Sequence, residues 1–259
     1  MGTLEHTDAD AATRPPADDE AREAAAGGAA KRAYVRRTFS EIAPRYDLLN
    51  HVLSLNIDRA WRRRAIAALG WERRPAGTYL DLCAGTLDVG AELARRPGFT
   101  GLVLGADFAE PMLRAGSAKV AGVALAPVVA DALQLPVAAG SVAGAIVAFG
   151  IRNVADLDAA LLEAHRVLAP GGRFAILEFS LPRARVIGAA YRAYFRFVLP
   201  VIGRLVSGHP TAYRYLPDSV ARFPVEEELA RRMTAAGFAG VHWQSLTFGI
   251  AALHVGEKP

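Results

Sequence analysis

The sequence predicts a doubly wound α/β fold in which helices cover a mostly parallel, seven-stranded sheet. Two observations lead to this prediction. Short apolar runs alternate with stretches of helical periodicity through the centre of the chain, a pattern typical of parallel sheets with right-handed crossovers. Several of these runs end in Gly or Asp, residue types that suit the ligand-binding turns at the carboxyl edge of such a sheet.

Seven strands account for the apolar runs. Five of them are expected in the centre, at residues 79–83, 102–107, 126–130, 142–149 and 173–179. Helices are expected between these strands: one up to about residue 96, one at 111–120 and one at 157–168, which is closed by Pro170-Gly171-Gly172. The last two strands are expected within 241–255, on either side of Phe248-Gly249.

The amino-terminal part precedes the sheet. Residues 1–30 are rich in Ala, Gly, Pro and acidic residues without apolar periodicity, which indicates a disordered tail. A single domain is expected over 31–259. It begins with a helical cap over 33–69 that is broken at Pro44, and it carries a cap or substrate insertion at 183–220.

The composition narrows the functional classes. A net charge of +4 is too small to indicate nucleic-acid binding, and the single cysteine, Cys83, excludes an intramolecular disulfide. No cluster of His and Cys indicates a metal site. The closest candidate for a membrane span, residues 186–206, is interrupted by Arg192, Arg196 and Arg204. We therefore expect a cytoplasmic protein, either free or peripheral on the inner face of the membrane.

Ligand-binding residue types follow the predicted strands. Gly85 and Thr86 follow the first strand, where Gly85 would let a ligand approach the backbone and Thr86 could donate a hydrogen bond. Asp107 ends the second strand, about twenty residues further on, the distance at which an acid typically binds ribose hydroxyls. Asp131-Ala132 follows the third strand, and its carboxylate could accept a hydrogen bond from an adenine amino group.

The turn after the first strand favours an adenosine ligand without phosphates. Leu87 stands where the G-x-G-x-x-G pattern of dinucleotide-binding turns requires its second glycine. Each signal also has an ordinary explanation, because a glycine turn is common loop chemistry and a strand-end Asp often caps a helix. Signals at the ends of four successive strands, the fourth being Phe149 to Asn153, favour a binding site.

Longer motifs connect the chain to a known family. Pro170-Gly171-Gly172 with the residues before it is common to many methyltransferases, whereas the segments around Tyr46, Arg152 and Tyr213 are more specific. On these motifs the chain resembles, from about Arg36 to Lys258, the ubiquinone/menaquinone biosynthesis C-methyltransferase family within the class I S-adenosylmethionine-dependent enzymes. The resemblance implies S-adenosylmethionine as the cofactor. The contacts it implies fall on Gly85, Thr86, Asp107, Asp131, Ala132 and the backbone of Ala148.

Three positions depart from the family pattern. The family usually has a small residue where this chain has Leu87, a side chain that could crowd the methionine part of the cofactor, and often Gly or Cys where it has Ala84. The closing motif usually has Arg where this chain has Val255.

The resemblance also implies a reaction, methyl transfer to a ring carbon of a polyprenylated hydroquinone, either demethylmenaquinol or a related benzoquinol. The acceptor carbon becomes electron-rich when a phenolic proton, whose pKa is about 10 in a free phenol, is removed. Arg152 is the catalytic candidate, through electrostatic stabilisation or, by way of an ordered water alone, as a base, and Asn153, Tyr46 and Tyr213 could orient the ring. Alternatively, Arg152 pairs with Asp156, and the two tyrosines are core or rim aromatics.

The remaining expectations concern partners. Arginines and aromatic residues interleave over 183–206, which suits either a cap at a membrane interface or a lid helix on the sheet. A homodimer is a further possibility. Alternative functions are methylation of another lipid or aromatic metabolite and a non-catalytic scaffold of a biosynthetic complex.

Overall fold

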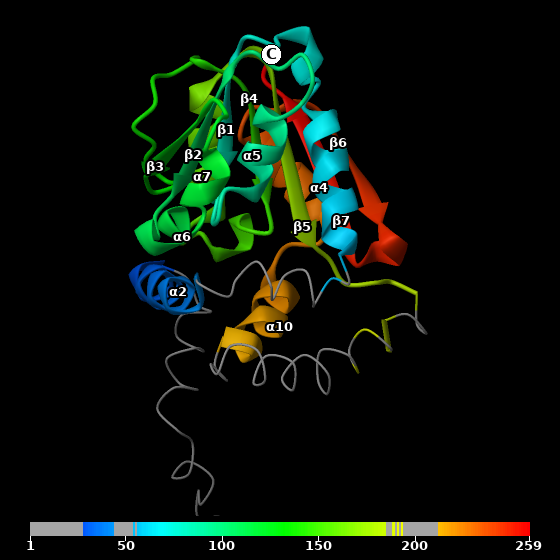
Figure 1. The fold of residues 1–259 in the computed structure, drawn as a ribbon. Coiled ribbons are helices and arrows are strands. Elements are labelled where there is room, and N and C mark those ends of the chain that lie inside the picture. Colours follow the sequence, from blue (N-terminus) through cyan, green and yellow to red (C-terminus); the bar gives the residue numbers. More distant parts are fainter. Residues whose placement is uncertain are drawn as a thin grey trace, which may run out of the picture.

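The computed structural model describes residues 28–43, 54, 56–184, 188–189, 191, 193 and 212–259, with the backbone alone for Ala29 and 212–216. These residues form one sheet with helices on both faces (Figure 1). Its strands are β1 (Thr78–Leu82), β2 (Leu102–Asp107), β3 (Leu125–Val129), β4 (Val142–Ala148), β5 (Leu168–Phe179), β6 (Ala239–Leu246) and β7 (Ala251–Glu257).

The strand order is β3-β2-β1-β4-β5-β7-β6. The first five strands run parallel, and β7 is antiparallel to both of its neighbours. Because the order reverses next to β1, the carboxyl ends of β1, β2 and β4 open onto a crevice at a topological switch point. The predicted doubly wound, mostly parallel, seven-stranded sheet is confirmed.

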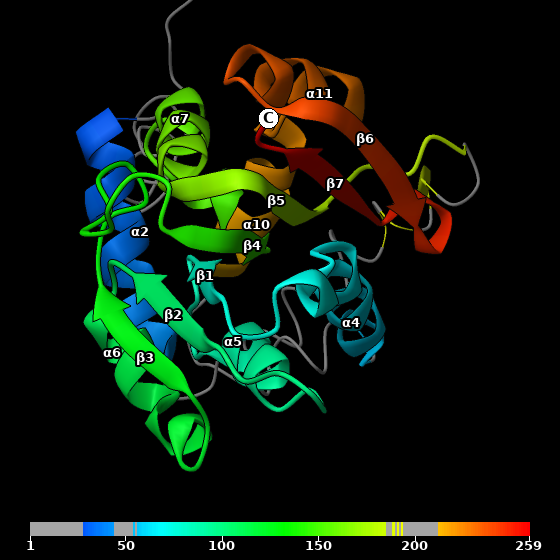
Figure 2. The ribbon, with the colours of Figure 1, turned by 90° about the horizontal axis from the view of Figure 1, so that it is seen from above.

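Helices cover both faces of the sheet. They are α2 (Gly28–Ile42), α4 (Ile57–Ala68), α5 (Asp88–Ala94), α6 (Glu110–Ala115), α7 (Leu157–Val167), α10 (Ala212–Arg222) and α11 (Glu226–Ala235). Short 3₁₀ turns are η2 (Trp71–Arg73), η3 (Ser117–Val120), η4 (Ile151–Asn153) and η6 (Thr247–Gly249). One apolar cluster joins α4 and α5 to the sheet, and a second joins α7 and α11 to its other face (Figure 2).

The predicted helix at 111–120 is wrong in its length. Helix α6 ends at Ala115, and η3 continues the chain after Gly116. Gly116 lies directly against the backbone of Thr86, so close that a Cβ at this position would collide with the Thr86 carbonyl. This contact between two loops fixes where α6 ends, and a one-dimensional pattern does not contain it.

The amino-terminal cap lies across the carboxyl edge of the sheet. Helix α2 begins at Gly28, inside the segment expected to be a tail, whereas residues 1–27 lie outside the described part. The Gly28 N–H donates to the Ala155 carbonyl at 3.3 Å, and Lys31 Nζ donates to the Arg152 carbonyl at 2.7 Å. The predicted break at Pro44 and most of the predicted 183–220 insertion also fall outside the described residues.

Candidate functional site

A cleft opens at the carboxyl ends of the parallel strands, beneath α2. Its empty space is about 680 Å³ when the open solvent at its mouth is counted. The turns after β1, β2, β3 and β4 line one side, and Arg32, Val35 and Phe39 of α2 line the other. Most of the lining is apolar, with a few polar groups that could orient a ligand.

The turn after β1 has an unusual backbone. Cys83, Gly85 and Leu87 all have a left-handed conformation, with φ of 53°, 52° and 69°. This conformation costs a residue with a side chain about 1 kcal/mol or more, and such strain concentrates at functional sites. Cys83 lies just beyond the strand in which it was expected, and it lines the cleft. Burial raises the pKa of its thiol, which suits the inert role expected of it.

The Leu87 side chain does not point into the cleft. It is fully buried in the core and packs directly onto Gly105 of β2, where a Cβ would collide with it. Leu87 is not among the described residues that line the cleft. The expected crowding of the cofactor is therefore wrong, because the side chain fills the space beneath the turn instead.

Asp81 lies buried beneath the same turn. Its Oδ2 accepts a hydrogen bond of 2.8 Å from the Gly90 N–H in the first turns of α5. Burial raises the pKa of this carboxyl from 3.8 to about 7, against the opposing effects of the Gly90 hydrogen bond and the Arg62 charge. The group therefore carries a proton in the folded protein over much of the acidic pH range.

Asp107 joins the first two turns. Its Oδ2 accepts from the Gly85 N–H at 2.8 Å, and its Oδ1 accepts from the Ala109 N–H at 2.9 Å. Burial raises the pKa of the carboxyl, and the backbone hydrogen bonds oppose the rise. Asp107 lines the cleft, and a carboxylate has about four acceptor positions, so it keeps acceptor capacity for a ribose hydroxyl.

Asp131 meets the amino-terminal helix across the cleft. Its Oδ2 lies 2.8 Å from a guanidinium nitrogen of Arg32, and its Oδ1 accepts from the Leu133 N–H at 3.0 Å. Ala132 lines the cleft beside it. Arg32 is mostly exposed, so this ion pair is weak, about 0–1 kcal/mol, and a bound ligand could displace it.

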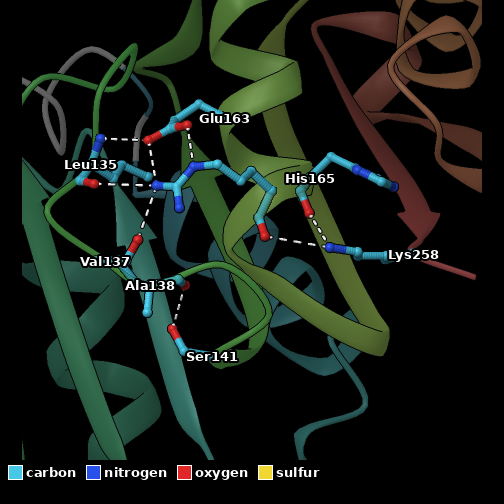
Figure 3. A network of polar contacts seen from close by, with 8 residues as sticks. Leu135, Val137, Ala138, Ser141, Glu163, His165 and Lys258 are labelled. Atoms are coloured by element: carbon cyan, nitrogen blue, oxygen red, sulfur yellow. Dashed lines mark hydrogen bonds and ion pairs between the residues drawn. The ribbon is translucent and has the colours of Figure 1, made fainter.

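The loop that follows Asp131 is clamped to α7. Glu163 accepts a 2.6 Å hydrogen bond from the Leu135 N–H, and Arg166 donates to the carbonyls of Leu135 and Val137 (Figure 3). Lys258 Nζ donates to the His165 carbonyl at 2.8 Å, which fastens the chain end to the same helix. The Glu163 and Arg166 contacts hold the loop after Asp131 in place.

Arg152 and Glu178 form a buried ion pair at the ends of β4 and β5. Arg152 Nη1 lies 2.7 Å from Glu178 Oε1, and the two side chains are only 6% and 2% exposed. The same nitrogen donates to the Phe149 carbonyl, and Nε donates to Ser219 Oγ of α10 at 3.3 Å. The alternative pairing of Arg152 with Asp156 is wrong, because Asp156 caps α7 through the Ala159 N–H at 3.0 Å.

Asn153 offers a buried acceptor to the cleft. Asn153 lines the cleft, and its Oδ1 is buried with no hydrogen-bond partner among the described residues. Because an unsatisfied buried polar group costs about 1–3 kcal/mol, such a group at a cleft indicates a ligand donor.

The structure brings together five of the predicted site residues, namely Gly85, Asp107, Asp131, Ala132 and Asn153. Thr86 and Ala148 lie beside the cleft without being among its described lining residues, and Arg152 lies behind it. Tyr46 lies outside the described residues, and for Tyr213 only its place in α10 is described. The roles of all these residues stay predictions.

Sequence reasoning missed the contribution of α2 and of Glu178. The sequence predicts a helical cap over 33–69, but only the fold shows that Phe39 of this cap lines the cleft. Glu178 had a usable signal, since it is a carboxylate near the end of a buried strand.

The described residues offer neither a metal site nor a membrane-spanning helix. No three His, Cys, Asp or Glu side chains in this part of the chain are arranged to hold a metal ion. None of the described helices is both long and apolar enough to cross a membrane.

Comparisons with known proteins agree with this geometry. The sequence matches the ubiE/COQ5 methyltransferase family over residues 28–258. It is 50% identical over 224 residues to a demethylmenaquinone methyltransferase of Thermus thermophilus, covering 85% of this chain and 100% of that protein. It is 45% identical over 228 residues to a ubiquinone/menaquinone biosynthesis C-methyltransferase UbiE of Geobacter sulfurreducens, covering 86% of this chain and 88% of that protein.

Among solved structures, the chain is similar to a SAM-dependent methyltransferase of Thermotoga maritima, described as a possible histamine N-methyltransferase. The TM-score is 0.60 at 20% identity, over 86% of this chain and 99% of that one. At this identity the similarity concerns the fold alone.

Proposed function

The chain belongs to the ubiE/COQ5 methyltransferase family, and from this premise we propose that it methylates a ring carbon of a polyprenylated hydroquinone, with S-adenosylmethionine as methyl donor. Demethylmenaquinol is the acceptor favoured by the name of the Thermus relative. The observation that carries the proposal is the cleft itself, whose lining includes the strand-end carboxylates and Asn153, a residue with an amide oxygen unpartnered among the described residues.

The residues of the cleft fit the donor. Gly85 leaves room at the first turn, and Asp107 keeps acceptor capacity for a ribose hydroxyl. Asp131 and Ala132 would hold the adenine end, once Arg32 has released the carboxylate. When bound, S-adenosylmethionine supplies an electrophilic methyl group on a positively charged sulfur.

Asn153 would align the acceptor. Its Oδ1 can accept a hydrogen bond from a quinol hydroxyl, which satisfies the buried oxygen and fixes the direction of the ring. Alignment matters because a methyl transfer between two bound molecules gains most of its rate from correct placement. The apolar remainder of the cleft, including Val35, Phe39 and Phe149, suits the ring.

Arg152 would act as a positioning residue. Its charge is balanced by Glu178 at 2.7 Å, so the pair exerts a weaker field on a quinolate than a lone guanidinium would. The same guanidinium binds the Phe149 carbonyl and Ser219, and the backbone of Arg152 leads directly into Asn153. This arrangement holds the acceptor side of the cleft in place.

A polyprenylated acceptor also implies a peripheral contact with a membrane on its cytoplasmic face, because such a molecule resides in lipid. A homodimer is retained as a prediction.

Calorimetric titration of S-adenosylmethionine tests the donor site. We expect micromolar binding by the wild-type protein and its loss in Asp107→Ala, with Asp158→Ala on the exposed face of α7 as a matched control that binds normally. Absence of binding at millimolar ligand would contradict the proposal and favour a non-catalytic scaffold. If the donor binds, an assay of methyl transfer to short-chain demethylmenaquinol and to a benzoquinol identifies the acceptor, and transfer to neither would point to another metabolite.

A further inference from the structure

Three large apolar side chains are exposed at one corner of the molecule. Phe248, in the η6 turn between β6 and β7, is 77% exposed, Leu181 after β5 is 48% exposed, and Ile57 at the start of α4 is 38% exposed. We call these three residues the hairpin edge. Soluble proteins commonly expose single apolar residues, so their grouping is what matters.

Two contacts bring these residues to one corner. Gly249 lies so close to Pro182 that a Cβ at Gly249 would be 3.4 Å from the Pro182 Cα, which places Phe248 beside Leu181. On the other side of the turn, Trp61 Nε1 donates to Thr247 Oγ1 at 2.9 Å. Ile57 lies one helical turn before Trp61 on the same face of α4.

The hairpin edge lies at the same end of the sheet as the cleft. Ala251, the first residue of β7, pairs with Phe179 at the carboxyl end of β5, so the turn before Ala251 projects beyond that end. Figure 1 shows this turn at the lower end of β6 and β7, on the side of the molecule where α2 and α10 lie.

The turn holds Phe248 outward in a strained conformation. Thr247 and Phe248 have φ of 45° and 59°, which is rare for residues with a side chain and rarest for a β-branched one. Thr247 has the Trp61 hydrogen bond to hold it, whereas the Phe248 ring is mostly in solvent and does not pack against the fold. A strained residue whose side chain faces solvent suits a role at the surface.

Positive charge adjoins the apolar residues. Arg64 is exposed on α4, two turns after Ile57 on the same side of the helix, and it has no ion-pair partner among the residues described. Arg183 follows Leu181 closely, but it is paired with Glu226 and Glu227. Apolar side chains beside an unpaired arginine suit a surface that rests on anionic lipid.

An apolar row connects the hairpin edge with the cleft. Phe149 lines the cleft, and its ring lies 4.5 Å from that of Phe179. The ring of Phe179 lies 6.5 Å from that of Trp61, whose indole binds Thr247 next to Phe248. The row therefore extends from the candidate acceptor site to the exposed corner.

From these observations we infer that the hairpin edge, with Arg64, docks on an anionic lipid bilayer. The inference rests on the proposed function in one respect, because a polyprenylated acceptor resides in the bilayer and the enzyme must reach it there. It adds the surface that makes the contact and the orientation that follows: the cleft end of the sheet faces the bilayer.

Vesicle co-sedimentation of the full chain tests the inference. Wild-type protein should bind vesicles that contain phosphatidylglycerol, and Phe248→Ser should bind about tenfold more weakly, as expected for one apolar side chain withdrawn from lipid. Arg64→Glu should lose affinity for anionic vesicles more than for neutral ones. Leu162→Ser is the matched control, since Leu162 is 57% exposed on α7, on the opposite face of the sheet from α4, and should bind as wild type.

Several results would overturn the inference. They are failure of the wild-type protein to bind anionic vesicles, equal binding by Phe248→Ser, or a loss in Phe248→Ser that sedimentation traces to a lost dimer. Methyl transfer to a short-chain, water-soluble quinol separates this inference from the proposed function. Phe248→Ser should keep that activity while losing transfer to a vesicle-bound quinol, whereas inactivity of the wild type on every quinol, with vesicle binding intact, would contradict only the proposed function.

Discussion

Replacing Arg152 by Met should destabilise the protein far more than the loss of one surface arginine. The change removes the cation that lies 2.7 Å from Glu178, whose side chain is 2% exposed, and leaves a buried carboxylate without its partner. Breaking a buried ion pair from one side costs about 3–5 kcal/mol of unfolding free energy. The hydrogen bonds that Arg152 donates to the Phe149 carbonyl and to Ser219 are lost as well.

The assay is urea unfolding followed by circular dichroism, with the slope of the transition checked for two-state behaviour. Arg114→Met serves as the control, because the Arg114–Glu110 pair is exposed and should contribute less than about 1 kcal/mol. A double-mutant cycle with Glu178→Gln isolates the interaction, and the double variant should recover a good part of the loss because no unpaired charge remains.

A loss below about 1 kcal/mol in Arg152→Met would refute this reasoning, since the carboxylate would then have found water or another partner. The reasoning would also be refuted if the free-energy losses of the two single variants simply added up in the double variant, because contacting residues should be coupled. Donor affinity measured on the same variants adds a functional readout: a positioning role predicts a larger effect on methyl transfer than on S-adenosylmethionine binding.

Three further predictions concern the turn after β1 and the acceptor side. Asp81 has a pKa of about 7 in the folded protein, against an ordinary value of 3.8, so it keeps its proton in the folded state after the unfolded state has lost it. The stability that this group contributes is therefore full below pH 4 and is lost as the pH rises to 7, by up to about 4 kcal/mol. In Asp81→Asn the free energy of unfolding should change less with pH between pH 4 and pH 8. An unchanged pH dependence would mean that other groups cause it. Leu87→Gly removes the strain of a positive φ, about 1 kcal/mol, but it also deletes a buried side chain that contributes about 2–5 kcal/mol. The variant should therefore have a lower free energy of unfolding and unchanged affinity for the donor. Tighter donor binding would show that Leu87 does crowd the cleft. Asn153→Ala should lower kcat/KM for the quinol about tenfold or more, as expected for the loss of one buried hydrogen bond. Calorimetry should show normal binding of the donor. An equal loss of affinity for the donor and for the quinol would indicate a general disturbance of the cleft.

The order of elements could be predicted from the sequence because each depends on local pattern. Strand β2 was expected at its observed bounds, and β1 and β4 within one residue, since a short apolar run between turn residues has few other ways to be buried. Gly85, Asp107 and Asp131 could be found for a related reason: parallel strands bring all their carboxyl ends to one edge, so residues at strand ends become neighbours whatever their distance in the chain.

Contacts between distant segments were decided by the tertiary structure alone. A positive φ at Leu87 turns its side chain down onto Gly105, whereas the sequence showed only a large residue in a turn that usually has a small one. The partner of Arg152 is Glu178, twenty-six positions away on the neighbouring strand, rather than Asp156 four positions on. The sequence by itself determined the class of fold and the edge where ligands bind, because hydrophobic period and strand ends are local properties. Only the folded chain decided which side chains face the cleft and which are paired behind it, because these depend on how the turns and strands pack against one another.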